Sequence, residues 1–130
     1  MKIYKFYFIQ FIVFLFFAST LHARFVWINF SQNTVATFFY DPGSLKESKK
    51  YKTVWILANY IKPTRSGEYS VLVKQKFDCR RARYKIMRLK SHALRNGRGP
   101  VIVNYPKQTD WKMIVASTPD SDLMKIICWK

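Results

Sequence analysis

Side chains that could carry out covalent or metal chemistry are few in this sequence. It has two histidines, His22 and His92, and two cysteines, Cys79 and Cys128. Two cysteines and one or two histidines with these spacings do not match a structural zinc motif, and neither GxSxG nor HExxH occurs. His92 falls in a predicted exposed loop, where a surface role is a simpler interpretation than that of a base. We therefore expect a protein without enzyme activity, metal or cofactor.

Basic side chains are the more informative group, because they alternate along two consecutive predicted strands. Alternate residues of a strand face the same side of a sheet, and like charges that face each other across strands destabilise it. A negatively charged partner would relieve this repulsion. The candidate anion-binding residues are Lys74, Lys76, Arg80, Arg81, Arg83, Lys85 and Arg88. The alternative is a solvated face whose charges only prevent aggregation.

The composition indicates one small, strongly basic domain. The 130 residues include 23 Lys and Arg against 7 Asp and Glu, a net charge of +16, which predicts an acidic or polyanionic partner or surface. Hydrophobic residues make up 49% of the chain, so a packed core is expected rather than a disordered basic tail. Nucleic acid is a weaker interpretation, because the basic strands lack an RNA-binding signature with paired aromatics and the chain carries an export signal.

Residues 1–23 have the pattern of a secretory signal peptide. Lys2 and Lys5 give a positive start, a mostly apolar run continues to Leu21, and small residues lead to Ala23. As a helix the apolar run would reach about 24 Å, short of the roughly 30 Å hydrocarbon core of a bilayer. We expect cleavage after Ala23, which leaves residues 24–130 as one exported domain. An uncleaved membrane anchor is the alternative.

Export makes a disulfide possible between the two cysteines. Cys79 and Cys128 are the only candidates, so their pairing is determined if a bond forms. Closing a loop of this length stabilises a small domain by about 4 kcal/mol on the chain-entropy model. The alternative is that both thiols stay buried and reduced.

The segment after the signal is predicted to form mainly β-strands. β-Branched and aromatic runs separated by turn residues predict strands over 25–30, 34–40, 51–61, 69–79, 81–90, 101–104 and 111–115. The strand over 51–61 is apolar on both faces and should be central. Residues 31–33, 41–44, 62–67 and 92–100 are expected to be turns or loops. The phase of the alternation slips near 86–87, which indicates either a β-bulge or a strand that is buried on different sides along its length.

A helix should close the chain. Ser117 or Thr118 is a suitable N-cap, and Pro119 suits the first turn. Leu123 and Ile127 lie at helical spacing, with Cys128 near the same stripe. Strands followed by a closing helix predict the α+β class, with a single curved antiparallel sheet packed against a C-terminal helix.

A set of motifs in this order resembles the surface-adhesin E domain family. The motifs span roughly the whole of residues 24–130: Trp27, Tyr40-Asp41-Pro42 with Ser44, Val54-Trp55-Ile56, Ser70 through Phe77-Asp78-Cys79-Arg80, Trp111 and Cys128. The resemblance implies an exported antiparallel sheet with a C-terminal helix and a Cys79–Cys128 bridge. It also implies a structural turn at Asp41, Pro42 and Ser44, and core or near-core positions for Trp27, Trp55 and Trp111.

The resemblance further implies adhesion to host extracellular proteins such as vitronectin and laminin. Two departures are evident: the cysteine that anchors the adhesin to lipid is missing, and the charge is unusually basic. The sequence therefore predicts an exported, non-enzymatic, adhesin-like protein of the periplasm, the outer surface or the medium. Its basic hairpin would contact a host matrix protein or a glycosaminoglycan. The alternative is a periplasmic structural protein of the envelope whose basic face meets lipopolysaccharide or other envelope phosphates. Whether the domain forms a homodimer through an open sheet edge is left undecided.

Overall fold

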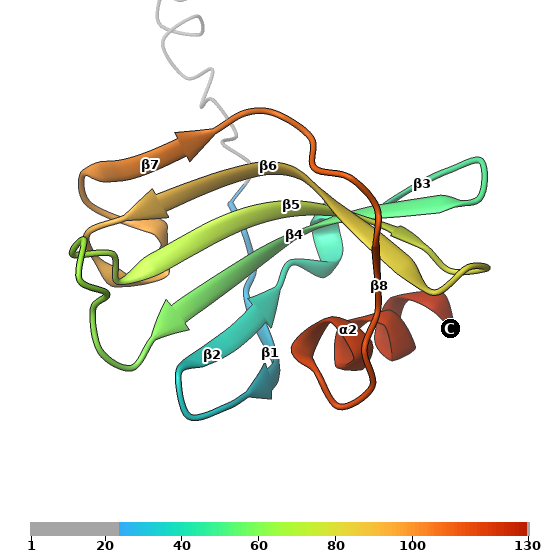
Figure 1. Cartoon of the computed structure of the whole chain (residues 1–130), viewed down its shortest axis with the longest axis horizontal. Coiled ribbons are helices and arrows are strands. Elements are labelled where there is room, and N and C mark those ends of the chain that lie inside the picture. The colour runs from blue at the N-terminus through green and yellow to red at the C-terminus, as the bar shows by residue number, and fades with distance from the viewer. Residues whose placement is uncertain (1–23, 130) are drawn as a thin grey trace, which may run out of the picture.

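The protein, described here by a computed structural model of residues 24–129, has one antiparallel sheet and one C-terminal helix (Figure 1). The predicted signal segment and its cleavage site lie outside the described residues. The elements in chain order are β1 (Ile28–Gln32), β2 (Ala36–Tyr40), the 3₁₀ turn η1 (Pro42–Ser44), β3 (Lys46–Ser48), β4 (Tyr51–Tyr60), β5 (Ser70–Asp78), β6 (Arg83–His92), the 3₁₀ turn η2 (Arg95–Gly97), β7 (Val101–Tyr105), β8 (Lys112–Met113) and α2 (Pro119–Cys128).

The sheet follows the strand order β1-β2-β4-β5-β6-β7, with β3 added beside β4 and β8 beside β6. All the described strand pairs are antiparallel. The long strands β4, β5 and β6 form its centre and curve strongly (Figure 1). The predicted α+β class with a single curved antiparallel sheet is confirmed.

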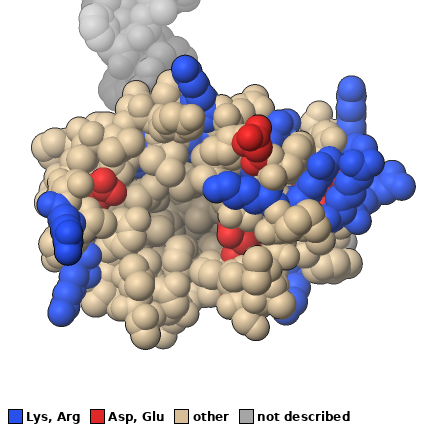
Figure 2. Space-filling view, in the orientation of Figure 1, with Lys and Arg blue, Asp and Glu red and all other residues tan. Residues whose placement is uncertain are grey.

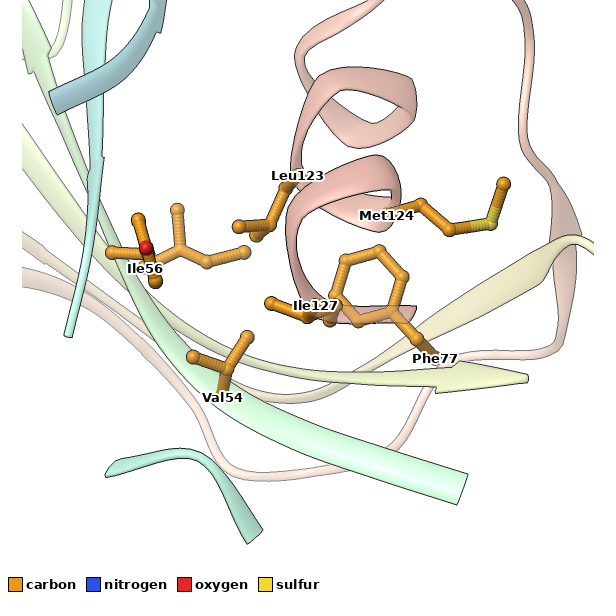
Figure 3. Packing of buried hydrophobic residues seen from close by; sticks show 7 residues of the cluster. Val54, Ile56, Phe77, Leu123, Met124 and Ile127 are labelled. Atoms are coloured by element: carbon orange, nitrogen blue, oxygen red, sulfur yellow. The ribbon is translucent and has the colours of Figure 1, made fainter. Parts of the chain in front are cut away.

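The hydrophobic core lies between the concave side of the sheet and α2 (Figure 3). Val54 and Ile56 of β4 and Phe77 of β5 meet Leu123 and Ile127 of the helix, and each is at most 6% exposed. We call this side of the sheet the helix face. The alternation predicted for β5 is what places its odd-numbered residues there.

Helix α2 begins and ends as its sequence indicates. The Thr118 hydroxyl accepts the Ser121 N–H at 3.3 Å, so Thr118 rather than Ser117 is the N-cap, and Pro119 takes the first helical position. At the other end, Lys52 Nζ donates to the Ile127 carbonyl at 2.7 Å, which satisfies one of the free carbonyls of the last turn.

The disulfide joins the end of β5 to the end of α2. The sulfurs of Cys79 and Cys128 are 2.07 Å apart, and the two residues are separated by 49 positions in the chain. The predicted pairing is thus present in the structure. It holds the last turn of the helix against the sheet.

Several predictions about local structure are wrong. Strand β1 begins at Ile28 rather than at Phe25, and β8 covers only Lys112–Met113. Residues 31 and 32 continue β1, and the turn lies at 33–35, where the Asn33 side chain accepts the N–H groups of Val35 and Ala36. Strand β6 begins at Arg83 rather than at Arg81, because the turn after Cys79 is longer than expected. His92 is the last residue of β6 and only 8% exposed, with Nδ1 3.1 Å from the Gly99 carbonyl oxygen. The following loop folds back over it, which its polar neighbours in the sequence did not indicate.

Candidate anion-binding face

The side of the sheet opposite the helix carries most of the candidate cations. The antiparallel register places Lys46 of β3 beside Thr53 of β4, Thr53 beside Lys76 of β5, and Lys76 beside Lys85 of β6. Paired residues of neighbouring strands project to the same side. These residues therefore form one row across four strands, and we call this side of the sheet the cationic face.

A second row lies one pleat further along the strands. Trp55 pairs with Lys74, and Lys74 pairs with Arg88. The register slips between Lys74 and Gln75, so that Met87 has no partner on β5. The predicted bulge near 86–87 is confirmed, and its effect is to keep Arg88 on the same side as Lys85. Regular alternation would have placed Arg88 on the helix face.

Each of the two facing lysines of the first row lies over an aromatic ring. Lys76 Nζ lies 5.5 Å from the centre of the Tyr51 ring, and Lys85 Nζ lies 4.9 Å from the centre of the Trp111 ring. The two rings are 5.4 Å apart, centre to centre. A cation over an aromatic face is attracted by the ring quadrupole, by about 0.5–1 kcal/mol at an exposed site. The rings therefore offset part of the repulsion between Lys76 and Lys85.

Arg83 differs from the other cations because it has an acidic partner. Its Nε donates to Asp78 Oδ2 at 3.0 Å, and its guanidinium lies 4.5 Å from the Trp111 ring centre. The Asp78 side chain is only 1% exposed. Burial by itself would raise the pKa of Asp78, but hydrogen bonds from the Arg83 side chain and the Arg81 backbone, with the charge of Arg83, outweigh it and lower that pKa. Arg83 is therefore held in place beneath the face.

Arg80 and Arg81 lie in the turn between β5 and β6 and are exposed. Arg81 had been expected on the strand face. With Lys50, at the neighbouring end of the β3–β4 hairpin, they line a pocket of about 240 Å³ that also reaches Asp78. Figure 2 shows Lys and Arg atoms gathered at this end of the sheet, where both turns lie.

The structure thus brings the predicted site residues together in two groups. Five lie in the strands of the cationic face, and Arg80 and Arg81 extend it at the turn. The sequence analysis missed Lys46, Lys50 and Tyr51, which join the same surface. A signal was present, since residues 46–52 contain four lysines beside a predicted central strand. Their relevance depended on β3 and on the register of β4 against β5.

Three tryptophans were expected at core or near-core positions, and the structure places them outside the buried cluster. Trp27, Trp55 and Trp111 are each half-buried, and the buried cluster under the helix contains none of them. Trp55 has Lys74 as its strand neighbour, so it belongs to the cationic face. Trp111 reaches the same face because the segment before β8 returns along the edge of β6, and its ring lies against Tyr51.

Residues 24–129 contain neither a metal-binding cluster nor a helix that could span a membrane. This part of the chain has no group of three or more His, Cys, Asp or Glu side chains that could hold a metal ion. Within the same residues, no helix combines the length and apolarity needed to cross a membrane.

Comparisons with known proteins show the family of this chain and the structures that share its fold. Residues 27–129 match the family model described as surface-adhesin protein E. The solved structures of Haemophilus influenzae protein E have the same fold: crystal form II has a TM-score of 0.62 at 16% identity over 86% of this chain and 94% of that one. The structure from a non-typeable strain also has a TM-score of 0.62 at 16% identity, over 86% and 81% of the two chains. A search of curated proteins found no match. The chain belongs to the surface-adhesin protein E family.

Proposed function

We propose that this protein is an exported, non-enzymatic, adhesin-like binding protein whose cationic face contacts an acidic ligand of the host extracellular matrix. The ligand would be a vitronectin- or laminin-like matrix protein, through an acidic segment, or a glycosaminoglycan. Membership of the surface-adhesin family supports the adhesive role. The ligand-contacting residues would be Lys74, Lys76, Arg80, Arg81, Lys85 and Arg88, with Arg83 as a supporting residue.

The observation that carries this proposal is the uncompensated charge of the rows. Among residues 24–129 the only side-chain ion pair is that between Arg83 and Asp78, so Lys76 faces Lys85 with no carboxylate between them. Neighbouring strands are about 4.8 Å apart, so the row from Lys46 to Lys85 extends roughly 15 Å. A linear polyanion laid across the strands would meet several cations at once.

A second candidate ligand is a phosphate group of the cell envelope, such as those of lipopolysaccharide. The pocket at the β5–β6 turn favours it, because three cations converge there on one small space. In that case the protein would act inside the envelope. Protease added to intact cells separates the two cases: degradation of the domain supports the adhesin, and protection supports the envelope protein.

Charge reversal at the turn tests the binding surface. The double variant R80E/R81E should bind heparin, vitronectin and laminin at least tenfold more weakly than the wild type, because it reverses two exposed cations next to the rows. The matched control is K62E/R65E, which makes the same change of net charge in the exposed β4–β5 loop, at the other end of β5.

The salt dependence of binding is the second part of the test. Wild-type binding should weaken steeply between about 0.15 M and 1 M NaCl, where the Debye length falls from about 8 to 3 Å. Equal binding by R80E/R81E and K62E/R65E, or binding unchanged at high salt, would contradict the proposed surface.

A further inference from the structure

A cavity of about 460 Å³ lies at the β3 side of the cationic face, with Trp55 in its wall. The N-terminal segment 24–26, the turn η1 and strands β3, β4 and β5 line it, and it is open to solvent on one side. Its volume falls within the range of about 300–1,000 Å³ common for small-ligand sites. Of the ligand-contacting residues proposed above, only Lys74 lines this cavity.

The cavity has an aromatic wall. Trp55 is half-buried, and Phe25 meets it edge-on with the ring centres 5.9 Å apart. Phe25 also stacks on Trp27 at 4.9 Å, which supports the N-terminal segment in this position. A flat, partly exposed indole offers a surface on which a ring with an apolar face can lie.

The cavity is also positively charged. Lys46 and Lys74 line it from two strands, and Arg24 adds a third cation. The acidic residue in its wall, Asp41, is only 6% exposed, and its Oδ1 accepts the Gly43 N–H at 2.9 Å, so this carboxylate belongs to the η1 turn. A concave site lined by one sign of charge concentrates the opposite charge.

We infer that this cavity binds an acidic sugar unit, one that carries a carboxylate or a sulfate group. The C–H face of the sugar ring would lie against Trp55, and the acidic group would meet Lys46 and Lys74. Thr53, which pairs with Lys46 and also lines the cavity, would offer its hydroxyl to the sugar as a hydrogen-bonding group. An anion without a ring would leave the aromatic wall unused, and a neutral sugar would leave the cations unpaired.

The cavity continues into the cationic rows. Thr53 pairs with Lys76, and Lys74 pairs with Arg88, so a chain that leaves the cavity passes directly onto the first and second rows. This inference rests on the proposed function for that continuation, and it narrows the ligand to an acidic polysaccharide. A free acidic sugar and a unit within such a polymer share the same chemistry, and probes of different length distinguish them.

The test compares two polyanions that differ in whether they contain sugar rings. A heparin tetrasaccharide and a short polyglutamate are titrated into the purified protein by calorimetry, with glucuronic acid as the single-unit probe. Three variants are used: Trp55→Leu, Lys74→Met and, as the matched control, Lys90→Met. Lys90 lies on β6 opposite Leu72, on the same side of the sheet but outside the cavity, and its substitution removes the same charge.

Tetrasaccharide affinity should fall about tenfold in Trp55→Leu and Lys74→Met, and less than twofold in Lys90→Met. Polyglutamate affinity should be unchanged in Trp55→Leu and fall equally in the two lysine variants. Thermal unfolding of each variant verifies that it is folded. Weak binding of glucuronic acid that Trp55→Leu abolishes would support a site for a single sugar unit. No glucuronic acid binding, with the tetrasaccharide losses intact, would support a site that needs the polymer.

Equal tetrasaccharide losses in Lys74→Met and Lys90→Met, with none in Trp55→Leu, would overturn the sugar site and leave the cationic face standing. Tight binding of a neutral tetrasaccharide would also overturn it. The proposed function fails by a different result, namely that neither polyanion binds the wild type or that R80E/R81E binds both as the wild type does.

Discussion

The two sides of the central sheet use the same strands for different purposes. On β5, Val73, Gln75 and Phe77 face the helix, whereas Lys74 and Lys76 face away from it. The helix face is closed by α2 and the disulfide, and its one buried amide, Gln75, donates to Asp120 at 2.8 Å. The cationic face is left half-open, with aromatic rings among like charges. The helix face therefore stabilises the fold, whereas the facing lysines of the cationic face lower its stability because they have no acidic partners.

Substitutions at two neighbouring residues of β5 should affect stability and binding separately, because the two side chains lie on opposite faces. Phe77→Ala removes a fully buried ring from the core and should lower the free energy of unfolding by about 3–5 kcal/mol. Lys76→Ala, one position earlier, should change it by less than about 1 kcal/mol while weakening polyanion binding. Urea denaturation and heparin binding of both variants measure this. A similar loss of stability in both would contradict the division between the faces.

Removing the disulfide should weaken the helix face in particular. The double variant C79A/C128A should lose about 2–4 kcal/mol, because a long loop is no longer closed in the unfolded chain. Hydrogen exchange should then show faster opening of α2 than of β4 and β5. Lys62→Ala, a substitution in an exposed loop, serves as the control. If α2 and the central strands were to lose protection together, the bridge would not be specific to the helix.

Asp78 is the buried carboxylate that holds Arg83 of the cationic face in position. Its pKa is lowered in the folded protein from the ordinary 3.8, so the ion pair contributes stability above pH 3.8 and loses it as the pH falls through the lower folded-state value. Asp78→Asn should therefore cost about 1–3 kcal/mol at pH 7.

The difference between Asp78→Asn and the wild type should shrink below about pH 4. Chemical denaturation across pH 2–7 measures it, with Asp110→Asn, at an exposed position, as the control. A difference that stays constant down to pH 2 would argue against an ionised Asp78 in the folded protein.

The smallest expected effect concerns the repulsion within the rows. Replacing Lys76 and Lys85 by methionine should reduce the salt dependence of the unfolding free energy by a few tenths of a kcal/mol, because two facing charges disappear. The variant K62M/R65M removes the same charge from the β4–β5 loop. Thermal unfolding between about 0.01 and 0.15 M NaCl compares them, and identical salt slopes would show that the aromatic rings already cancel the repulsion.

Much of the fold could be predicted because its signals are local. The period of β5, the apolar run of β4, the phase slip at Met87 and the capping residues before α2 each depend on a few neighbouring residues, and each was found in the structure. Strand β3 was missed because Lys46–Ser48 is three residues long and fully exposed, so its strand conformation comes from pairing with β4.

The candidate site was predicted less completely, because part of it also depends on contacts between distant segments. The alternation of Lys74, Lys76, Arg83 and Lys85 indicated a shared face, and the register confirms their positions. The position of Trp111 beside two cations could not be predicted, because it requires a segment almost thirty residues further along the chain to return beside β6.

By itself, the sequence determined where the long strands lie, where the C-terminal helix begins and which cysteines can pair. Backbone preferences and side-chain periodicity act over a few residues, so these features needed no knowledge of distant contacts. Only the tertiary structure decided that Lys46 lies in a row with Lys85, that His92 is buried and that Trp55 borders a charged cavity. Those arrangements arise from strand register and from loops that fold back, and their free energy comes from contacts between parts of the chain that are far apart in sequence.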